Sequence, residues 1–315
     1  MNNIWGSMEQ YDPIVWHWLI AIYLFMAGLS AGSILVAIGL KWYKENRGLP
    51  TDGMPLILAA SSTAPVAICV GMLVLVLDLT KPFEFYLILL NYNVTSVMSL
   101  GVIALLIYMP LVFIFSALVF EKRVLQYLPW LAKVLKVCRQ LEWGIEKLLF
   151  VLALGVAVYT GFLLSALTSY PILNTAVLPA LFLASALSVG SAANVLIATL
   201  FFNDTESDGI EQLHRIEYLV TFSEVLCLVM LFASLGFAGT AGQAATAAIT
   251  TGTWAGTFWF GVVGIGIIVP VLASLFTSKD FKATKSYIIP VCCSVIIGVM
   301  SLRIFILYGG QSYLG

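Results

Sequence analysis

Eight long apolar stretches dominate this sequence and set what it can fold into. They cover residues 16–42, 54–78, 94–119, 145–168, 176–202, 213–238, 255–276 and 286–307. Each can cross the hydrocarbon core of a bilayer, which is about 30 Å thick and takes roughly 20 helical residues. The stretches are continuously apolar, whereas the strands of a membrane barrel alternate over about ten residues. We therefore predict an all-α integral membrane protein with eight transmembrane helices.

Composition excludes several other classes of protein. The protein is 61% hydrophobic and 10% charged, far below the charged fraction of about 25% that is usual in soluble domains. A net charge of −1 gives no basic field for nucleic acid, so membrane lipid is the expected surrounding. The five cysteines show no CxxC or Cys/His spacing, and we predict no metal site, iron–sulfur cluster or disulfide framework. The two histidines lie near span ends on opposite faces of the membrane, which argues against a haem with paired axial ligands.

The loop charges predict an orientation. Thirteen of the 15 Lys and Arg residues lie on one side of the predicted spans: Lys41, Lys44, Arg47, Lys122, Arg123, Lys133, Lys136, Arg139, Lys147, Arg215, Lys279, Lys282 and Lys285. The opposite side carries Lys81, with Arg303 inside the eighth span near that face. Because cytoplasmic loops carry the excess of cations, we predict that both termini are periplasmic.

The long third loop has an amphipathic pattern. Leu131, Val134, Leu135, Cys138 and Leu141 share one helical face, and the cations of the segment lie away from that face. Such a pattern is typical of a helix that lies in the membrane interface, and we expect an anchor on the anionic inner leaflet.

A short motif recurs half the sequence apart. Leu29-Ser30-Ala31-Gly32-Ser33 in the first span matches Leu187-Ser188-Val189-Gly190-Ser191 in the fifth, at an offset of 158 residues. Small residues are also common wherever membrane helices approach closely, so this similarity leaves duplication and chance both open. Four spans per half would relate the halves by an axis along the membrane normal.

Ionisable residues within the spans are few and therefore informative. Each costs about 2.5–3.5 kcal/mol at mid-helix on insertion scales, and Glu146, Glu217 and Glu224 are three of them. Five potential proton or hydrogen-bond groups converge on the outer third of four helices: His17, Tyr23, Asp78, Tyr159 and Arg303. This convergence predicts a pocket that binds a polar headgroup and passes protons to the outer side. A quinone fits, since its carbonyls need donors, its quinol form needs bases and its tail needs a lipid-accessible cleft.

Each of these residues also has a structural interpretation. His17 lies between Trp16 and Trp18, and the tyrosines suit the aromatic belts that line membrane interfaces. Asp78 could pair with Lys81 or Arg303 at a helix end. Alternatives stay open for the other ionisable residues: Glu224 suits either a proton relay or a helix-pairing contact, Glu146 an interfacial charge, and His214 a solvated rim.

Five segments in order resemble one family. They are Trp16-x-Trp18-x-Ile20-Ala21-Ile22-Tyr23-Leu24-Phe25 with Gly28-Leu29-Ser30-Ala31-Gly32, Asp78-Leu79-Thr80-Lys81-Pro82, Thr95-Ser96-Val97-Met98-Ser99, Tyr159-Thr160-Gly161-Phe162-Leu163-Leu164-Ser165-Ala166-Leu167 with Ser169-Tyr170-Pro171, and Arg303-x-Phe305-Ile306-Leu307-Tyr308. In these segments the sequence resembles the NrfD/PsrC family, the quinol-binding membrane subunits of nitrite, polysulfide, thiosulfate and related respiratory reductases.

The resemblance implies an architecture and a set of partners. It implies two four-helix bundles, here residues 1–168 with the quinol site and residues 169–315, in the inner membrane of a bacterium. It implies a menaquinol site near the periplasmic face and a neighbouring periplasmic four-cluster iron–sulfur protein. Electrons would pass through that protein to a catalytic reductase subunit, either a molybdopterin enzyme or a multihaem cytochrome.

The resemblance also assigns roles to residues. In the polysulfide reductase branch, an asparagine and a histidine on the first helix and a tyrosine on the fourth contact the quinone. By register these positions fall on Ile20, Tyr23 and Tyr159. Together with the convergence above, we predict Asp78 and His17 as proton acceptors. We predict Tyr23, Tyr159, Arg303 and Lys81 as quinone contacts, and Glu224 as a proton relay.

The function that these residues favour is a quinol-oxidising subunit of an oxidoreductase complex, without a redox centre of its own. A secondary transporter and a purely structural membrane anchor are the alternatives. A transporter should gather polar residues near the midplane between the halves, and an anchor needs no polar cluster in the membrane.

Overall fold

The computed structural model describes residues 16–51, 53–79, 96–167, 170, 172–202, 208–237 and 239–311. Within these ranges the protein is helical and has no strand, and eight helices are long and apolar enough to cross a membrane. The predictions of an all-α fold and of eight transmembrane helices are therefore confirmed.

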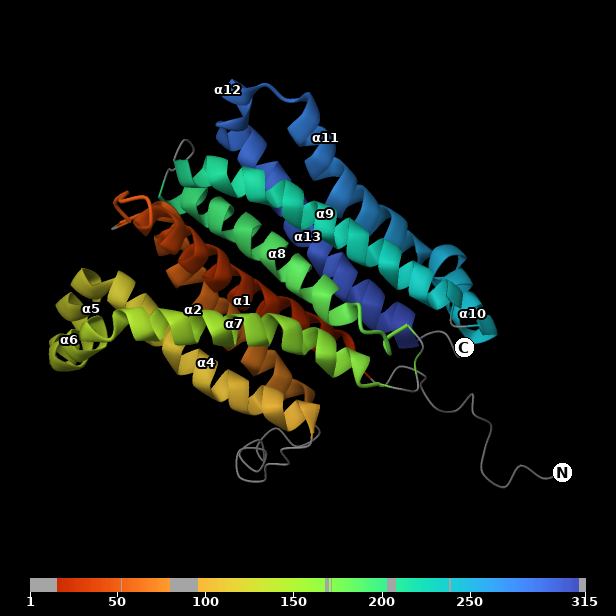
Figure 1. The fold of residues 1–315 in the computed structure, drawn as a ribbon, viewed down its shortest axis with the longest axis horizontal. Coiled ribbons are helices and arrows are strands. Elements are labelled where there is room, and N and C mark those ends of the chain that lie inside the picture. The colour runs from red at the N-terminus through yellow and green to blue at the C-terminus, as the bar shows by residue number, and fades with distance from the viewer. Residues whose placement is uncertain are drawn as a thin grey trace.

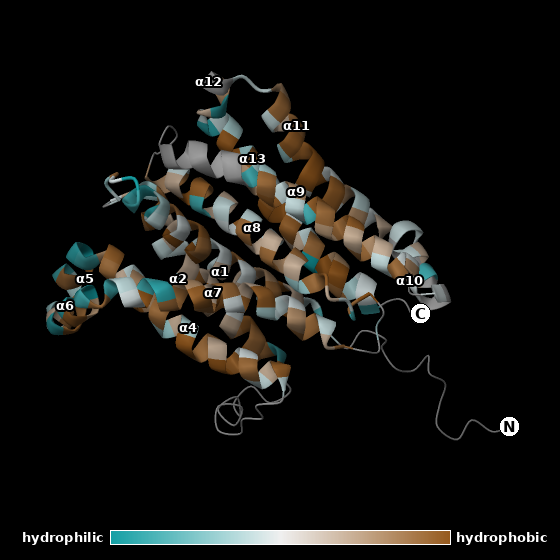
Figure 2. Cartoon of the chain, in the orientation of Figure 1, coloured by the Kyte–Doolittle hydropathy of each residue, from teal (hydrophilic) through white to brown (hydrophobic). Residues whose placement is uncertain are grey.

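The spans follow the apolar stretches closely. They are α1 (Trp18–Glu45), α2 (Pro55–Asp78), α4 (Val97–Val119), α7 (Glu142–Ser165), α8 (Leu178–Phe201), α9 (Asp208–Phe237), the π-helix η4 (Thr257–Ile268) with α11 (Val269–Phe276), and α13 (Lys285–Ile304) with the π-helix η5 (Phe305–Gly309). The shorter elements are α5 (Glu121–Tyr127), η3 (Pro129–Leu131), α6 (Ala132–Gln140), α10 (Gly239–Thr251) and α12 (Lys279–Lys282). The long helices lie side by side along one direction, and the hydrophilic residues gather toward their ends (Figures 1 and 2).

Helices α1 and α8 form the centre of the fold. α1 packs against α2, α7, α8 and α13, and α8 packs against α1, α2, α7, α9 and α13. These two are the most buried spans of the molecule. The helices of the first half, α1, α2, α4 and α7, therefore meet the second half mainly through α8, which contacts α1, α2 and α7 (Figure 1). The predicted boundary at residues 168 and 169 lies outside the described residues, so the division into two bundles stays a prediction.

The repeated motifs meet at this contact. A methyl group on Gly32 would overlap the carbonyl of Ala186, and one on Gly190 would overlap the backbone of Gly32. Asn194 donates from Nδ2 to the Ser33 carbonyl at 3.0 Å beside the crossing. Gly32 and Gly190 occupy the same position in the two copies of the motif. Small residues are found at any close crossing of membrane helices, so duplication and chance both stay open.

A pair of hydrogen bonds joins the two ends of the described sequence. The Trp16 backbone N–H donates to Gln311 Oε1 at 2.8 Å, and Gln311 Nε2 donates back to the Trp16 carbonyl at 3.1 Å. The start of α1 and the end of η5 therefore lie at the same end of the bundle, as an even number of spans requires. That this end faces the periplasm stays a prediction, and we refer to it below as the outer end.

The opposite, inner end holds an ionic network. Lys41 of α1 donates to Glu142 at 2.9 Å and to Glu146, and both carboxylates belong to α7. Arg139 of α6, within the long loop, bonds Glu142 at 2.9 Å and Glu121 at 3.3 Å. This network ties α1, α7 and the loop helices together at the face that carries most of the cations. Glu146 is buried and paired, so it is a structural charge.

The segment predicted as an interfacial helix is helical, as α6, and its place in the membrane interface stays a prediction. Leu135 is buried, and Val134 and Leu141 are more than half exposed. Trp130, in the turn before α6, is 72% exposed. A set of apolar residues that the protein leaves uncovered on a charged helix suits burial in the lipid headgroup region. Figure 2 shows α5 and α6 as a largely hydrophilic pair at the inner end of the bundle.

The close crossing of α1 and α8 yields a stability prediction. Gly32→Ala adds a methyl group that only separation of two backbones can accommodate, so we expect a loss of about 1–3 kcal/mol or more. Gly39→Ala is the matched control, because Gly39 lies on the same helix with nothing within 4 Å of an added methyl group. Thermal unfolding of both variants in detergent checks this. Equal midpoints for the two would contradict the role of the crossing.

Candidate functional site

Two tyrosines from different helices lie near each other in the first half. Tyr23 of α1 is 2% exposed, and Tyr159 of α7 is half-buried. Their charges would be close enough to interact if both were ionised. Tyr23 is five residues from the start of α1 and Tyr159 six from the end of α7, which places both about 8–9 Å from the outer ends of their helices at 1.5 Å per residue. The structure therefore brings these two predicted site residues together at one depth.

Two glycines shape this site. Gly71 of α2 packs against α1, where a methyl group on it would lie 3.8 Å from Tyr23 Cδ2. Gly101 of α4 lies against the ring of Tyr159, and a methyl group there would overlap the Cζ and Oη atoms of that ring. The Tyr159 ring thus fills space that is free because residue 101 has no side chain. Helices α1, α2, α4 and α7 all contribute to the site.

Asp78 lies at the outer rim above the tyrosines. It ends α2 and is half-buried. Seven residues separate it from Gly71, which places it on the same helix face about 10 Å further outward. Within the described part of the protein, no hydrogen bond or ion pair of its carboxylate is found. His17 is exposed at the N-terminal cap of α1, six residues before Tyr23 and also at the rim.

Arg303 is not part of this group in the structure. Lys81 lies outside the described residues. Arg303 belongs to α13 and is fully buried. It lies against the face of α1 that is turned toward the second half. There its Nη2 donates to the Phe182 carbonyl at 3.3 Å, its guanidinium lies 3.6 Å from the centre of the Phe182 ring, and Gly28 leaves room for it. Residues 23 and 28 are five apart, so they project from α1 about 140° apart. The expected ion pair of Asp78 with Arg303 is absent from the described residues.

The charge that faces Arg303 is Glu224 of α9. The two groups are near enough for their charges to interact, yet no hydrogen bond joins them. Glu224 Oε1 and the Nε and Nη1 atoms of Arg303 are buried without a hydrogen-bond partner. Buried polar groups rarely stay unsatisfied, so water is the expected partner at this place.

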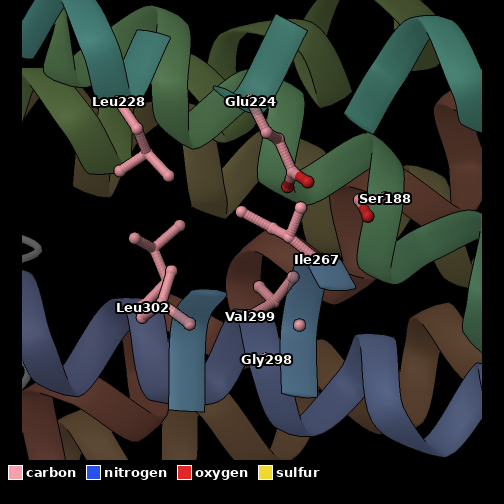
Figure 3. Close-up of a pocket in the computed structure, with 9 residues that line it drawn as sticks. Ser188, Glu224, Leu228, Ile267, Gly298, Val299 and Leu302 are labelled. Carbon is pink, nitrogen blue, oxygen red and sulfur yellow. The ribbon is translucent and has the colours of Figure 1, made fainter. Parts of the chain in front are cut away.

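A small cavity beside Glu224 has room for such a water. Its volume is about 20 Å³, and it is lined by Ser188, Glu224, Leu228, Val262, Gly266, Ile267, Gly298, Val299 and Leu302. Figure 3 shows the Glu224 carboxylate and the Ser188 hydroxyl as the polar groups among labelled apolar side chains. Two cavities of about 20 and 10 Å³ border Glu217, seven residues earlier on α9. A cavity of roughly 10–15 Å³ or more suffices for one water.

The cysteines take no part in either group. Cys69, Cys138, Cys227, Cys292 and Cys293 are free thiols. Over the described ranges, no group of three or more His, Cys, Asp or Glu side chains is placed to hold a metal ion.

Sequence reasoning missed the partners of the site residues. The sequence does not mark Gly101 or Phe182 as contacts of the site residues, because glycine and phenylalanine are common in apolar spans. The sequence does place Gly101 one helical turn into its span, at about the depth expected for Tyr159. Whether the two residues touch depends on how α4 is rotated about its axis, which the sequence does not indicate.

Comparison with known proteins decides the family. Residues 6–315 match the family model described as Polysulphide reductase, NrfD. The protein belongs to the NrfD family. It is 44% identical over 319 residues to the C subunit of polysulfide reductase from Wolinella succinogenes, with the full length of both proteins covered. It is 38% identical to Protein NrfD of Escherichia coli strain K12, covering 97% of this protein and 98% of the relative. The NrfD homolog of Haemophilus influenzae is 37% identical over 95% of each protein.

Membership of the NrfD family confirms the resemblance on which the expectations rested. Together with the eight apolar spans it identifies a multi-pass protein of the bacterial inner membrane. The names of the relatives place this family in respiratory reductase complexes, so the protein is a membrane subunit of such a complex.

The contact between Gly101 and Tyr159 gives a testable prediction. Gly101→Ala should destabilise the protein by about 1–3 kcal/mol, because the added methyl group displaces the ring. In a Tyr159→Ala background the same change should cost little, since the space is then empty. A double-mutant cycle on thermal unfolding in detergent measures this coupling. Gly155→Ala, at an open position of α7, is the control, and an uncoupled Gly101 and Tyr159 would refute the contact.

Proposed function

We propose that this protein oxidises menaquinol near the outer face of the membrane, as the membrane subunit of its reductase. The observation that carries the proposal is the placement of Tyr23 and Tyr159 at one depth with Asp78 above them. Two phenols at this depth can hydrogen-bond the oxygens of a quinol ring, as donors or acceptors. A carboxylate at the rim can take the protons. Membership of a family that includes a polysulfide reductase subunit supports this assignment.

The chemistry balances with no redox centre in this subunit. A quinol that becomes a quinone loses two electrons and two protons. The protons leave through Asp78, with His17 as a second acceptor at the rim, and pass to water. The electrons leave to a partner at the outer face, for which a periplasmic four-cluster iron–sulfur protein is the proposal. That protein would hand them to a catalytic subunit, either a molybdopterin enzyme or a multihaem cytochrome.

Arg303 takes a different role in this proposal from the one expected. Since it lies across α1 from the tyrosines, we assign it to the contact between the halves and not to the quinone headgroup. Lys81 stays a proposed headgroup contact, because it follows Asp78 by three residues in the sequence.

Substitutions at the site test the proposal. Asp78→Asn keeps size and removes the base, and loss of a general base typically slows a reaction about 100- to 10,000-fold. Tyr159→Phe keeps the ring in place and removes one hydrogen bond, which should weaken quinol binding by about 0.5–1.5 kcal/mol. The measurement is oxidation of a menaquinol analogue by the intact complex.

Two controls separate this outcome from a loss of assembly. An artificial dye that donates electrons directly to the partner subunits should drive wild-type rates in both variants. Tyr43→Phe and Glu45→Gln remove a hydroxyl and a carboxylate at the inner end of α1, and both should oxidise quinol normally. Wild-type quinol oxidation by Asp78→Asn and Tyr159→Phe would show that the proposed site is wrong.

A proton relay at Glu224 is a second proposed role, favoured by the unsatisfied buried polar atoms of Glu224 and Arg303. The cavities along α9 have volumes of about 20, 20 and 10 Å³, which suit single waters and are too small for a transported solute. They suit a proton path through Glu217 and Glu224. This size argument favours a relay within the quinol-oxidising subunit over a secondary transporter.

Proton counting in proteoliposomes tests the relay. Quinol chemistry alone releases one proton for each electron, and a relay adds to that ratio. We expect wild type to exceed this value and Glu224→Gln to return to it, with dye-driven electron transfer unchanged. Glu45→Gln, exposed at the inner end, is the control. A wild-type ratio equal to the chemical value would dismiss the relay and leave the quinol proposal standing.

A further inference from the structure

A large groove reaches from the middle of the bundle to its inner end, and its volume is about 620 Å³. This volume falls within the roughly 300–1,000 Å³ of typical ligand sites. Its floor is formed by Met26 and Leu29 of α1, and one wall by Val66 and Val70 of α2. None of its lining residues belongs to the quinol site or to the Glu224 cavity. We refer to it as the Arg123 groove.

The groove runs from mid-membrane to the inner end of the bundle. The opposite wall, Ile197 and Phe201, belongs to the last turns of α8. The inner rim is Phe120, at the end of α4, with Arg123 in α5. From Ser62 to Val70 the groove follows α2 for about 12 Å at 1.5 Å per residue. Ser62 is itself about 10 Å from the inner end of α2, so the groove extends from that end past the middle of the helix.

The walls favour a hydrocarbon tail over a polar ring. The hydroxyls of Ser62 and Thr63 both donate to the Ala59 carbonyl at 2.8 Å, so their protons are already used inside α2. The remaining lining residues other than Arg123 are apolar. A quinone headgroup needs donors for its carbonyls, and the groove offers none below its rim. Val66 is 64% exposed, so the groove is open to lipid.

The rim favours a negative charge. Arg123 is exposed, and within the described part of the protein no carboxylate pairs with it; its guanidinium lies 5.9 Å from the centre of the Phe120 ring. Glu121, two residues earlier, is engaged by Arg139 at 3.3 Å. An arginine binds phosphate well through its planar fork of donors. The cytoplasmic leaflet, to which the loop cations assign this end, is the anionic surface that basic residues next to a membrane recognise.

We propose that the Arg123 groove binds an anionic phospholipid of the inner leaflet, with one acyl tail along α2 and the phosphate at Arg123. The bound tail bridges α1, α2 and α8, which include both helices of the central crossing. This site is separate from the proposed quinol site and does not depend on it.

Two pairs of variants test the proposal on the purified full-length protein. Arg123→Gln removes the rim cation, and Lys122→Gln makes the same charge change at the exposed neighbour, which does not line the groove. Val66→Trp fills the groove, and Leu73→Trp places the same ring two turns further along the exposed face of α2, outside the lining.

Native mass spectrometry measures binding of phosphatidylglycerol and phosphatidylcholine with matched acyl tails, and of a short-tailed menaquinone. We expect wild type to prefer phosphatidylglycerol about fivefold, the preference given by one basic group near an anionic headgroup. Arg123→Gln should abolish this preference and Lys122→Gln should keep it. Val66→Trp should reduce binding of both lipids, and Leu73→Trp should not.

Several outcomes would overturn the proposal. Equal binding of the two lipids by wild type would remove the anionic site. If Arg123→Gln and Lys122→Gln lowered the preference for phosphatidylglycerol equally, that preference would come from general surface charge and not from the groove. Menaquinone that displaces the lipid from wild type but not from Val66→Trp would make the groove a quinone site. A dimer that Val66→Trp dissociates would make it an interface between copies of the protein.

Discussion

The contact of α1 and α8 at Gly32 and Gly190 is the constraint on which the rest of the structure depends. Lipid tails are as apolar as the helices, so packing of small residues and hydrogen bonds must hold membrane helices together. Two glycines at the crossing let the backbones touch, and the bond from Asn194 to the Ser33 carbonyl adds a polar link. With these two helices held together, their remaining faces are directed outward, and each half of the molecule is built on one of them.

This central position gives α1 two functional faces. One presents Tyr23 to α2 and α7, where Tyr159 approaches it, and the other presents Gly28 to Arg303. The candidate quinol site and the buried pair of Glu224 and Arg303 are therefore neighbours across one helix, and neither requires the other. A change at Arg303 reaches the quinol site only indirectly, through α1 or α8, because Arg303 contacts Gly28 and Phe182.

The spans and the depth of the site residues could be predicted from the sequence, because long apolar runs and loop charges are local signals. The apolar stretch 54–78 predicts a span, and the helix is Pro55–Asp78. Where a boundary moved, a distant partner explains it: α7 begins at Glu142 and not near residue 145, and Glu142 and Glu146 both pair with Lys41 of α1. The position of Arg303 across α1, its neighbour Glu224 and the contact of Tyr159 with Gly101 could not be predicted. Each depends on how one helix is rotated against another, and no local pattern records that angle.

Membrane energetics explains why the polar groups divide by depth. A charge inside the hydrocarbon core is costly, whereas a neutral phenol that finds a hydrogen bond is tolerated. The buried residues of the candidate site are accordingly tyrosines, and its carboxylate, Asp78, lies at the half-buried end of a helix where water can take a proton from it. A quinol ring at the depth of the tyrosines would keep its tail in lipid while its hydroxyl protons travel about 10 Å outward, the rise from Gly71 to Asp78. The same cost explains why Glu224 and Arg303, which are ionisable and deep, lie near enough for their charges to interact, with Glu224 beside a water-sized cavity.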